Sequence, residues 1–180
     1  MNGKIPPQAI ELEEAVLGAV MLEKSALVEN ISSLIPHYFY KDSHRMICQA
    51  IVDLYAEGSP VDILTVTARL RKKNELDKSG GAFAVTELTE SVSSGSNTAY
   101  HLTLIKEKYL LREMISLGSD LQQKGYDNST DCFELIDHAQ VNLMNVVQGF
   151  VRKGLIPIKS SVTSVIEDMA QNMAKNERNE

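Results

Sequence analysis

The sequence predicts an all-α fold: a globular multi-helix head, followed by a long antiparallel helical hairpin and a C-terminal linker helix. Apolar residues recur at a spacing of three and four through most of the 180 residues, as they do along one face of a helix. No stretch alternates apolar and polar residues in the manner of a half-buried strand. Hydrophobic residues make up 43% of the chain and aromatic residues only 6%, which indicates a globular protein with an aliphatic core.

The head is expected to cover residues 1–96 and to contain five helices. The first follows Pro6-Pro7 and reaches about Glu23, with an apolar face and an opposite, acidic face. The second covers residues 26–35 and ends before Pro36, because the residue before a proline disfavours helical geometry. The apolar positions of the first helix are Leu12, Ala15, Val16, Ala19 and Val20.

The last three helices of the head are bounded by capping residues and glycines. Asp42 is the expected N-cap of the third helix, which ends at Gly58, and Asp62 is the expected N-cap of the fourth. Gly80-Gly81 precedes the fifth and is interpreted as a tight turn rather than an anion-binding nest. The apolar positions of these helices are Ile47, Ala50, Ile51, Leu54 and Tyr55, then Leu64, Ala68 and Leu70, then Phe83, Ala84 and Leu88.

Residues 97–150 are expected to form the hairpin. No helix breaker interrupts the apolar pattern from Asn97 to Leu121, so a single helix of roughly 40 Å is expected to project from the head. A turn at residues 125–128 leads to a second helix that starts at the capping residue Asp131. We expect the projecting helix to contribute an oligomer interface through Tyr109, Leu111, Met114, Ile115, Leu117 and Leu121. The alternative is a hairpin that buries all of its apolar residues within itself.

Residues 151–180 are expected to form a linker and a final amphipathic helix. Its apolar stripe, Val162, Ile166, Met169 and Met173, has no following segment to pack against. The stripe therefore folds back on the chain, docks on another molecule, or meets a domain outside these 180 residues.

Catalytic and metal-binding patterns are missing from the sequence. The only Gly-Lys dipeptide is Gly3-Lys4, so there is no P-loop, and the four histidines never occur at the i, i+4 spacing of a helical metal site. The acidic residues Glu11, Glu13 and Glu14 are interpreted as favourable charges in the first turn of a helix. We expect no catalytic residue, metal or cofactor in this part of the protein.

Charge and cysteine content limit the partners and the location. The net charge of −6 predicts little or no direct DNA binding, and the basic run from Arg69 to Lys73 is assigned to the end of a helix. Cys48 and Cys132 have apolar neighbours and are expected to be buried thiols. With no secretory signal and no membrane span in the sequence, a reducing cytoplasm is the expected location.

The order of short motifs resembles the N-terminal domain of the DnaB family of replicative DNA helicases. The resemblance covers residues 6 to about 150, and it rests on the whole series rather than on any one motif. The matching residues are the stretch from Pro6 to Gly18, His37-Tyr38-Phe39-Tyr40 with His44 and Ile47, Gly58-Ser59-Pro60-Val61-Asp62, Gly80-Gly81, Asn97-Thr98-Ala99-Tyr100, and Arg112.

This resemblance implies a scaffold and not a motor. It implies hairpins that pair between neighbours, heads that form a trimer of dimers above a hexameric motor ring, and a linker helix that packs on an adjacent motor domain. The RecA-like ATPase domain, with its ATP and Mg²⁺, would begin where this sequence stops. The head would receive the C-terminal domain of primase and, in some lineages, a helicase loader. Glu14 and Tyr100 are the docking residues that we expect.

Two other classes of function remain open at this point. One is a free-standing helical adaptor or dimerisation module with no motor attached. The other is a small helical hydrolase that uses His44 and Glu14 as an acid/base pair.

Overall fold

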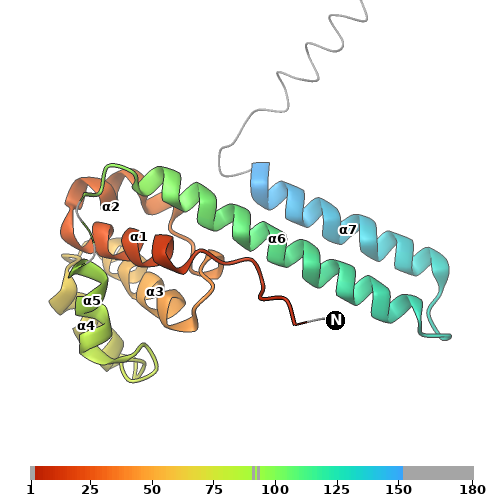
Figure 1. Ribbon diagram of the computed structural model, residues 1–180, viewed down its shortest axis with the longest axis horizontal. Helices are drawn as coiled ribbons and strands as arrows, with labels where there is room; N and C mark the ends of the chain where they lie inside the picture. Colours follow the sequence, from red (N-terminus) through yellow and green to blue (C-terminus); the bar gives the residue numbers. More distant parts are fainter. Residues whose placement is uncertain (1–2, 91, 93, 152–180) are drawn as a thin grey trace, which may run out of the picture.

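The computed structural model describes residues 3–90, 92 and 94–151, and these residues contain helices and no strand. The predicted all-α class is therefore confirmed (Figure 1). In chain order the helices are α1 Ile10–Leu22, α2 Lys24–Asn30, the 3-10 turns η1 Ile31–Ser33 and η2 Pro36–Tyr38, α3 Asp42–Ala56, α4 Ile63–Lys72, α5 Gly81–Glu90, α6 Thr98–Gly125 and α7 Cys132–Val151. Among the described residues, no helix combines the length and the apolar character needed to cross a bilayer.

Helix α1 is the centre of the head, and it is buried on more sides than its predicted single apolar face. Six consecutive residues from Val16 to Met21 are buried, because α2, α3, α5 and α6 all pack against this helix. Gly18 shows how closely α5 approaches. A Cβ atom at this position would lie 2.0 Å from the carbonyl oxygen of Leu88, so only glycine fits.

The core of the head is aliphatic, as its composition predicts. Phe39 is the one aromatic side chain of the head with no exposed surface. The aliphatic residues packed around it come from every helix of the head and from the start of α6: Val16, Leu17, Val20, Leu27, Leu34, Ile47, Ile51, Leu54, Val66, Leu70, Val85, Leu88, Leu102 and Ile105.

Two helix boundaries in the head differ from the prediction. Helix α2 begins at Lys24 and ends at Asn30, where the Asn30 side chain donates to the carbonyl oxygen of Ala26, and the 3-10 turn η1 follows. Asp42 is the first residue of α3 and not its N-cap, which is Lys41. The Asp42 carboxylate accepts from Arg45 Nη1 at 2.8 Å instead of from a backbone amide.

The predicted N-cap of α4 is confirmed, but the side of the helix that faces the core was predicted wrongly in part. Asp62 accepts from the amide of Thr65, and the Thr65 hydroxyl accepts from the amide of Asp62, which is a reciprocal capping box. The residues that face the core are Val66, Thr67 and Leu70. Several predicted apolar positions are exposed instead: Leu64, Ala68, Tyr55 and Phe83.

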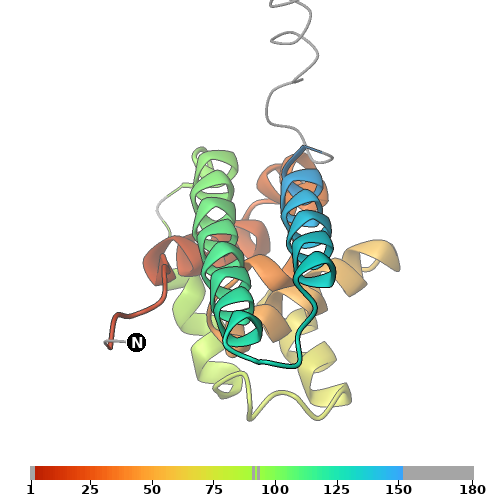
Figure 2. The ribbon, with the colours of Figure 1, turned by 90° about the vertical axis from the view of Figure 1, so that its right-hand side faces the viewer.

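Helix α6 connects the head to the hairpin. Its first two turns lie in the head, where Leu102 and Ile105 are buried, and the rest of its 28 residues extend beyond it. At 1.5 Å per residue the helix is about 42 Å long, close to the prediction. After a turn, α7 returns along the outer part of α6, and Figure 2 shows the two helices side by side.

The two cysteines lie in different environments. Cys48 is fully buried in the head, and this burial raises the pKa of its thiol. Cys132 is exposed at the start of α7, so its predicted burial is wrong.

Candidate functional site

Arg112 fixes the angle at which α6 leaves the head. Its guanidinium donates to the carbonyl oxygens of Pro7 and Tyr38, both at 2.7 Å. The Arg112 carbon Cζ also lies 5.8 Å from the centre of the Tyr109 ring, which packs against Tyr38 at 4.9 Å. The hairpin is therefore tied to the N-terminal arm and to η2 by charge-assisted hydrogen bonds and aromatic contacts.

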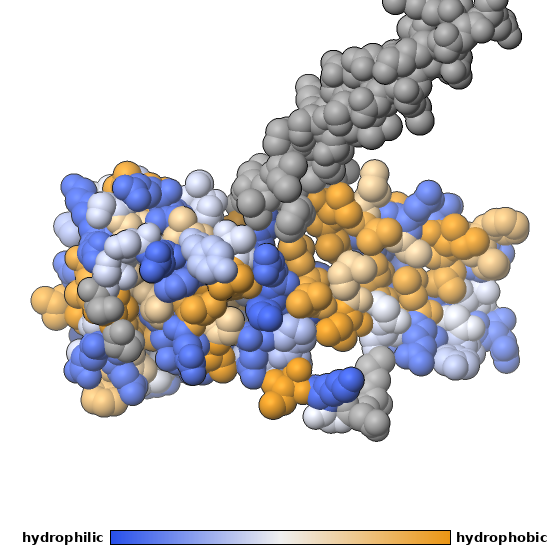
Figure 3. Space-filling model, turned by 45° about the horizontal axis from the view of Figure 1, so that its top comes forward, coloured by the Kyte–Doolittle hydropathy of each residue, from blue (hydrophilic) through white to orange (hydrophobic). Residues whose placement is uncertain are grey.

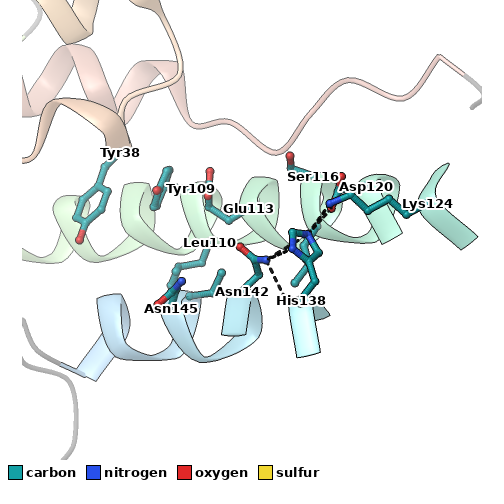
Figure 4. Close-up of a pocket in the computed structure, with 12 residues that line it drawn as sticks. Tyr38, Tyr109, Leu110, Glu113, Ser116, Asp120, Lys124, His138, Asn142 and Asn145 are labelled. Carbon is teal, nitrogen blue, oxygen red and sulfur yellow. Dashed lines mark hydrogen bonds and ion pairs between the residues drawn. The ribbon is translucent and has the colours of Figure 1, made fainter. Parts of the chain in front are cut away.

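One side of the hairpin seam is polar. His138 on α7 lies 2.7 Å from Asp120 on α6, whose carboxylate also accepts from Lys124 Nζ at 3.0 Å (Figure 4). Asn142 donates to the backbone carbonyl oxygen of His138. The hydrogen bond from His138, together with Lys124, holds the pKa of the Asp120 carboxyl below its usual value. This cluster connects α6 to α7 and lines a hollow of about 590 Å³ that extends to Tyr109 at the head.

The opposite side of the seam is apolar, and we call it the apolar face. It contains a groove of about 480 Å³ between α6 and α7, lined by Met114, Leu117, Gly118, Leu121, Ile136, Ala139, Gln140 and Leu143. Gln140 is the one polar residue among them. Large apolar side chains continue from this groove onto the exposed surface of both helices: Leu111, Met114 and Ile115, then Phe133, Ile136, Leu143, Met144 and Val147.

The exposure of this face is large for a protein surface. Ile115, Ile136 and Met144 are 53%, 53% and 56% exposed, and Phe133 is 78% exposed. Figure 3 shows hydrophobic residues gathered over the outer part of α6 and α7, whereas the head surface is mixed. Single exposed apolar residues are normal, but a contiguous apolar surface of more than a few hundred Å² marks an interaction site. Within the described part of the chain, the apolar residues of the hairpin are thus not all buried.

The structure divides the predicted interface residues into three groups. Leu111, Met114 and Ile115 are exposed on the apolar face. Leu117 and Leu121 are half-buried and line its groove. Tyr109 lies elsewhere, at the junction with Tyr38 and Arg112.

The α7 half of the apolar face was not among the predicted interface residues. Phe133, Ile136, Gln140, Leu143 and Val147 follow the three-and-four spacing of one helix face. That periodicity was available in the sequence. Which side of α7 turns outward, however, depends on the seam made by Asp120 and His138.

Glu14, one of the predicted docking residues, lies in a cleft of about 570 Å³ between α1, α3 and α5. Its carboxylate pairs with Lys41 Nζ at 3.0 Å and lies 3.9 Å from His44 Nε2. Tyr100, the other docking residue, is 65% exposed in the first turn of α6. The cleft brings together the two residues considered for acid/base chemistry.

His44 is mainly engaged with a different carboxylate, that of Glu13. Glu13 is 1% exposed and lies 2.8 Å from His44 Nδ1. It also accepts from the backbone amides of Tyr40 and Lys41. These hydrogen bonds satisfy a buried charge and join α1 to the connector and to α3, which is a structural role.

Within the described ranges, no group of three or more histidine, cysteine or acidic side chains could hold a metal ion. The predicted linker-helix residues Val162, Ile166, Met169 and Met173 lie outside the described residues.

Comparisons with known proteins agree on one family. The sequence model of the family described as the DnaB-like helicase N-terminal domain matches residues 5–107 of this chain. The replicative DNA helicase DnaB of Rhodothermus marinus is 39% identical over 165 residues, which are 92% of this chain and 17% of that protein. DnaB of Geobacillus stearothermophilus is also 39% identical, over 81% of this chain and 32% of the relative. The chain thus spans a third or less of these relatives.

A solved structure shows the same fold. The crystal structure of the N-terminal domain of DnaB helicase from Mycobacterium tuberculosis matches with a TM-score of 0.73 and 34% identity, covering 78% of this chain and 99% of that one. A structure described as a DnaB-like replicative helicase and its interactions with primase matches with a TM-score of 0.63 and 26% identity, covering 90% of this chain and 35% of that one. The chain therefore belongs to the family of DnaB-like helicase N-terminal domains.

Proposed function

We propose that this chain is the assembly and docking region of a replicative DNA helicase, and that it supplies geometry rather than force. The parent protein unwinds duplex DNA by ATP-driven translocation in an ATPase domain, which also holds the ATP and Mg²⁺. The observation that carries the proposal is the apolar face of the hairpin, which two helices display side by side.

The occupant of this face is a second copy of the same hairpin. The face is two helices wide, and its α7 part from Phe133 to Val147 is about 21 Å long. A second hairpin has the same length, width and apolar character, and two such pairs form a four-helix bundle. A standard interface buries about 800 Å² per partner, and eight large apolar side chains that are about half exposed supply an area of that order. Two-fold pairing also closes the assembly, as in most homo-oligomers.

Sedimentation velocity at micromolar concentration tests the dimer. The chain should sediment at twice its mass of 19.9 kDa. Ile115→Asp places a charge on the apolar face and should shift the protein to the monomer. Gln123→Asp, on an exposed position of the same helix outside this face, should leave the dimer unchanged. Strict monomers of the unmodified chain at high concentration would reject the proposal.

In the full-length helicase these dimers associate further, into a trimer of dimers above a hexameric ring. We place the docking of the primase C-terminal domain on the head, at Glu14 and Tyr100, and a loader docks there in lineages that use one. The structural relative described with primase interactions supports a primase partner. The net charge of −6 supports little or no direct DNA binding by this region.

Calorimetric titration with the primase C-terminal domain tests the docking residues. Glu14→Ala and Tyr100→Ala should each weaken binding about tenfold or more. Glu11→Ala, an exposed residue of the same acidic segment, should not. Equal affinities for all three variants would move the docking site away from these residues.

The linker helix docks on the ATPase domain of an adjacent subunit. Val162, Ile166, Met169 and Met173 form an apolar stripe in the sequence that suits such a contact. Amide exchange after Gly154 should be fast in the 180-residue chain and slow in the full-length helicase. Slow exchange in both proteins would indicate that the stripe packs within the 180 residues.

A free-standing adaptor would use the same apolar face. The coding sequence beyond residue 180 distinguishes the two functions. A P-loop within about 60 codons supports the helicase, and a stop codon supports the adaptor.

A further inference from the structure

Gly118 lies inside α6, where glycine is the least favourable residue after proline. Gly18, which also lies inside a helix, has a visible cause, because its missing side chain lets α5 approach α1. At Gly118 a Cβ atom would meet no atom of the described chain within 4 Å. The contact that explains this glycine is therefore not made within the described part of the chain.

The position of Gly118 indicates what makes that contact. It lies four residues after Met114 and seven after Leu111, so it shares their side of the helix. It also lines the groove of the apolar face, across from the small residue Ala139 of α7. Two small residues thus lie among large exposed aliphatic side chains. They leave a depression in the surface, into which the backbone of another helix can pack.

We infer that Gly118 marks the crossing point of the proposed dimer, at which α6 of the second copy packs against α6 with the two-fold axis beside this residue. The inference rests on the proposed pairing of hairpins. Small residues let helix backbones approach closely, which is the role that Gly18 has within the head.

The two-fold axis fixes which other residues meet. When two antiparallel copies of α6 cross at Gly118, residues at equal distances before and after it face each other. Ile115 of one copy then meets Leu121 of the other, three residues to either side. Ile115 is 53% exposed in the single chain, and the crossing covers it with an apolar partner. The same symmetry places Met114 of one copy beside Gln122 of the other.

Disulfide trapping tests the crossing directly. Gly118→Cys is introduced together with Cys132→Ser, because Cys132 is exposed and would cross-link on its own, while Cys48 stays in the buried core. A disulfide needs Cα atoms about 4.4–6.8 Å apart, which only residues at the axis provide. Under mild oxidation this variant should form a covalent dimer at least ten times faster than Gln123→Cys in the same background. Equal rates would overturn the crossing at Gly118.

A filling variant gives an independent result. Leucine is a much better helix former than glycine, so at a solvent-facing position Gly118→Leu would raise the melting temperature and leave dimerisation unchanged. At a helix crossing it should instead raise the dimer dissociation constant at least tenfold, whereas Gln123→Leu should not. If the unmodified chain is dimeric and Gly118→Leu dimerises equally well, the crossing is wrong and the proposed function stands. If the unmodified chain is monomeric at all concentrations, both are wrong.

Discussion

The head and the hairpin are built from the same kinds of aliphatic residue, yet they bury them very differently. The head encloses Leu17, Phe39 and Ile51 with no exposed surface. From residue 107 to residue 147, no described residue is buried to that degree. The described residues thus complete the core of the head and leave that of the hairpin incomplete.

This difference shows that the apolar periodicity predicts where a helix forms but does not determine how far its apolar side chains are buried. In the head, α1 is surrounded by neighbours and its side chains pack on several sides. In the described hairpin, α7 and the outer part of α6 pack mainly against each other, so each buries a narrow seam and exposes much of the rest. A pair of helices cannot enclose all of its own apolar surface, and the remainder is available for assembly.

The largest expected contrast comes from two phenylalanines. Phe39→Ala should lower the free energy of unfolding of the head by about 3–5 kcal/mol, because it removes a fully buried side chain and leaves a cavity. Phe133 is 78% exposed on the hairpin, so Phe133→Ala should change the free energy of unfolding of the head by less than about 0.5 kcal/mol. Urea denaturation followed by circular dichroism measures both. Similar losses for the two variants would contradict the separation of head and hairpin.

The next contrast comes from Gly18, whose tight site makes even alanine too large. Gly18→Ala should destabilise the head by about 1–3 kcal/mol, because the new methyl group would meet the backbone oxygen of Leu88 at 2.0 Å. Gly118→Ala, with open space in the chain, should not lower the helix content of the hairpin. Thermal denaturation measures the stability of the Gly18→Ala variant, and far-ultraviolet circular dichroism measures the helix content of the Gly118→Ala variant. A Gly18→Ala protein as stable as the unmodified chain would show that α5 can move away from α1.

The sequence was sufficient wherever a local rule decided the structure. The uninterrupted pattern from Asn97 predicted the long helix α6, and Asp62 was correctly predicted as a cap because its partner Thr65 lies three residues away. Asp42, like Asp62, is an aspartate near the start of a helix, but its carboxylate accepts a hydrogen bond from Arg45. Local patterns therefore fail where a second local interaction is stronger.

Other features depend on contacts that are distant in the sequence. Glu13 looks like its neighbours Glu11 and Glu14 in the sequence. Its burial is explained by distant partners, the amides of Tyr40 and Lys41 and the ring of His44. Cys132 has apolar neighbours, but Phe133 and Ile136 are themselves exposed, so those neighbours do not cover it. The α6 half of the apolar face was predicted from periodicity. The α7 half has the same periodicity, but its outward orientation depends on the position of the seam.

A smaller contrast is expected between the two aspartate caps. Asp62→Ala should destabilise the head by about 1 kcal/mol, because it removes the capping box of α4. Asp131 accepts from the amides of Phe133 and Glu134 at the start of α7, so Asp131→Ala should fray that turn without affecting the head. Amide exchange resolved by residue distinguishes the two effects. Loss of protection in α4 after Asp131→Ala would indicate that the two regions unfold together.

The smallest expected effect is on the polar side of the hairpin seam, through the titration of Asp120. The folded chain lowers the pKa of this carboxyl from its ordinary value of 3.8, mainly through the hydrogen bond with His138. A group whose pKa is lower in the folded state stabilises that state above its ordinary pKa and loses this contribution as the pH falls through the folded value. Amides of α6 and α7 near Asp120 should therefore lose protection from exchange below about pH 4.

The Asp120→Asn variant should show reduced protection of these amides already at neutral pH, and no further loss specific to the seam on acidification. Because Asp53 and Glu57 also titrate at low pH in the head, the decisive quantity is the difference between the unmodified chain and Asp120→Asn. If that difference does not change between pH 7 and pH 3, the Asp120–His138 contact does not hold the hairpin together.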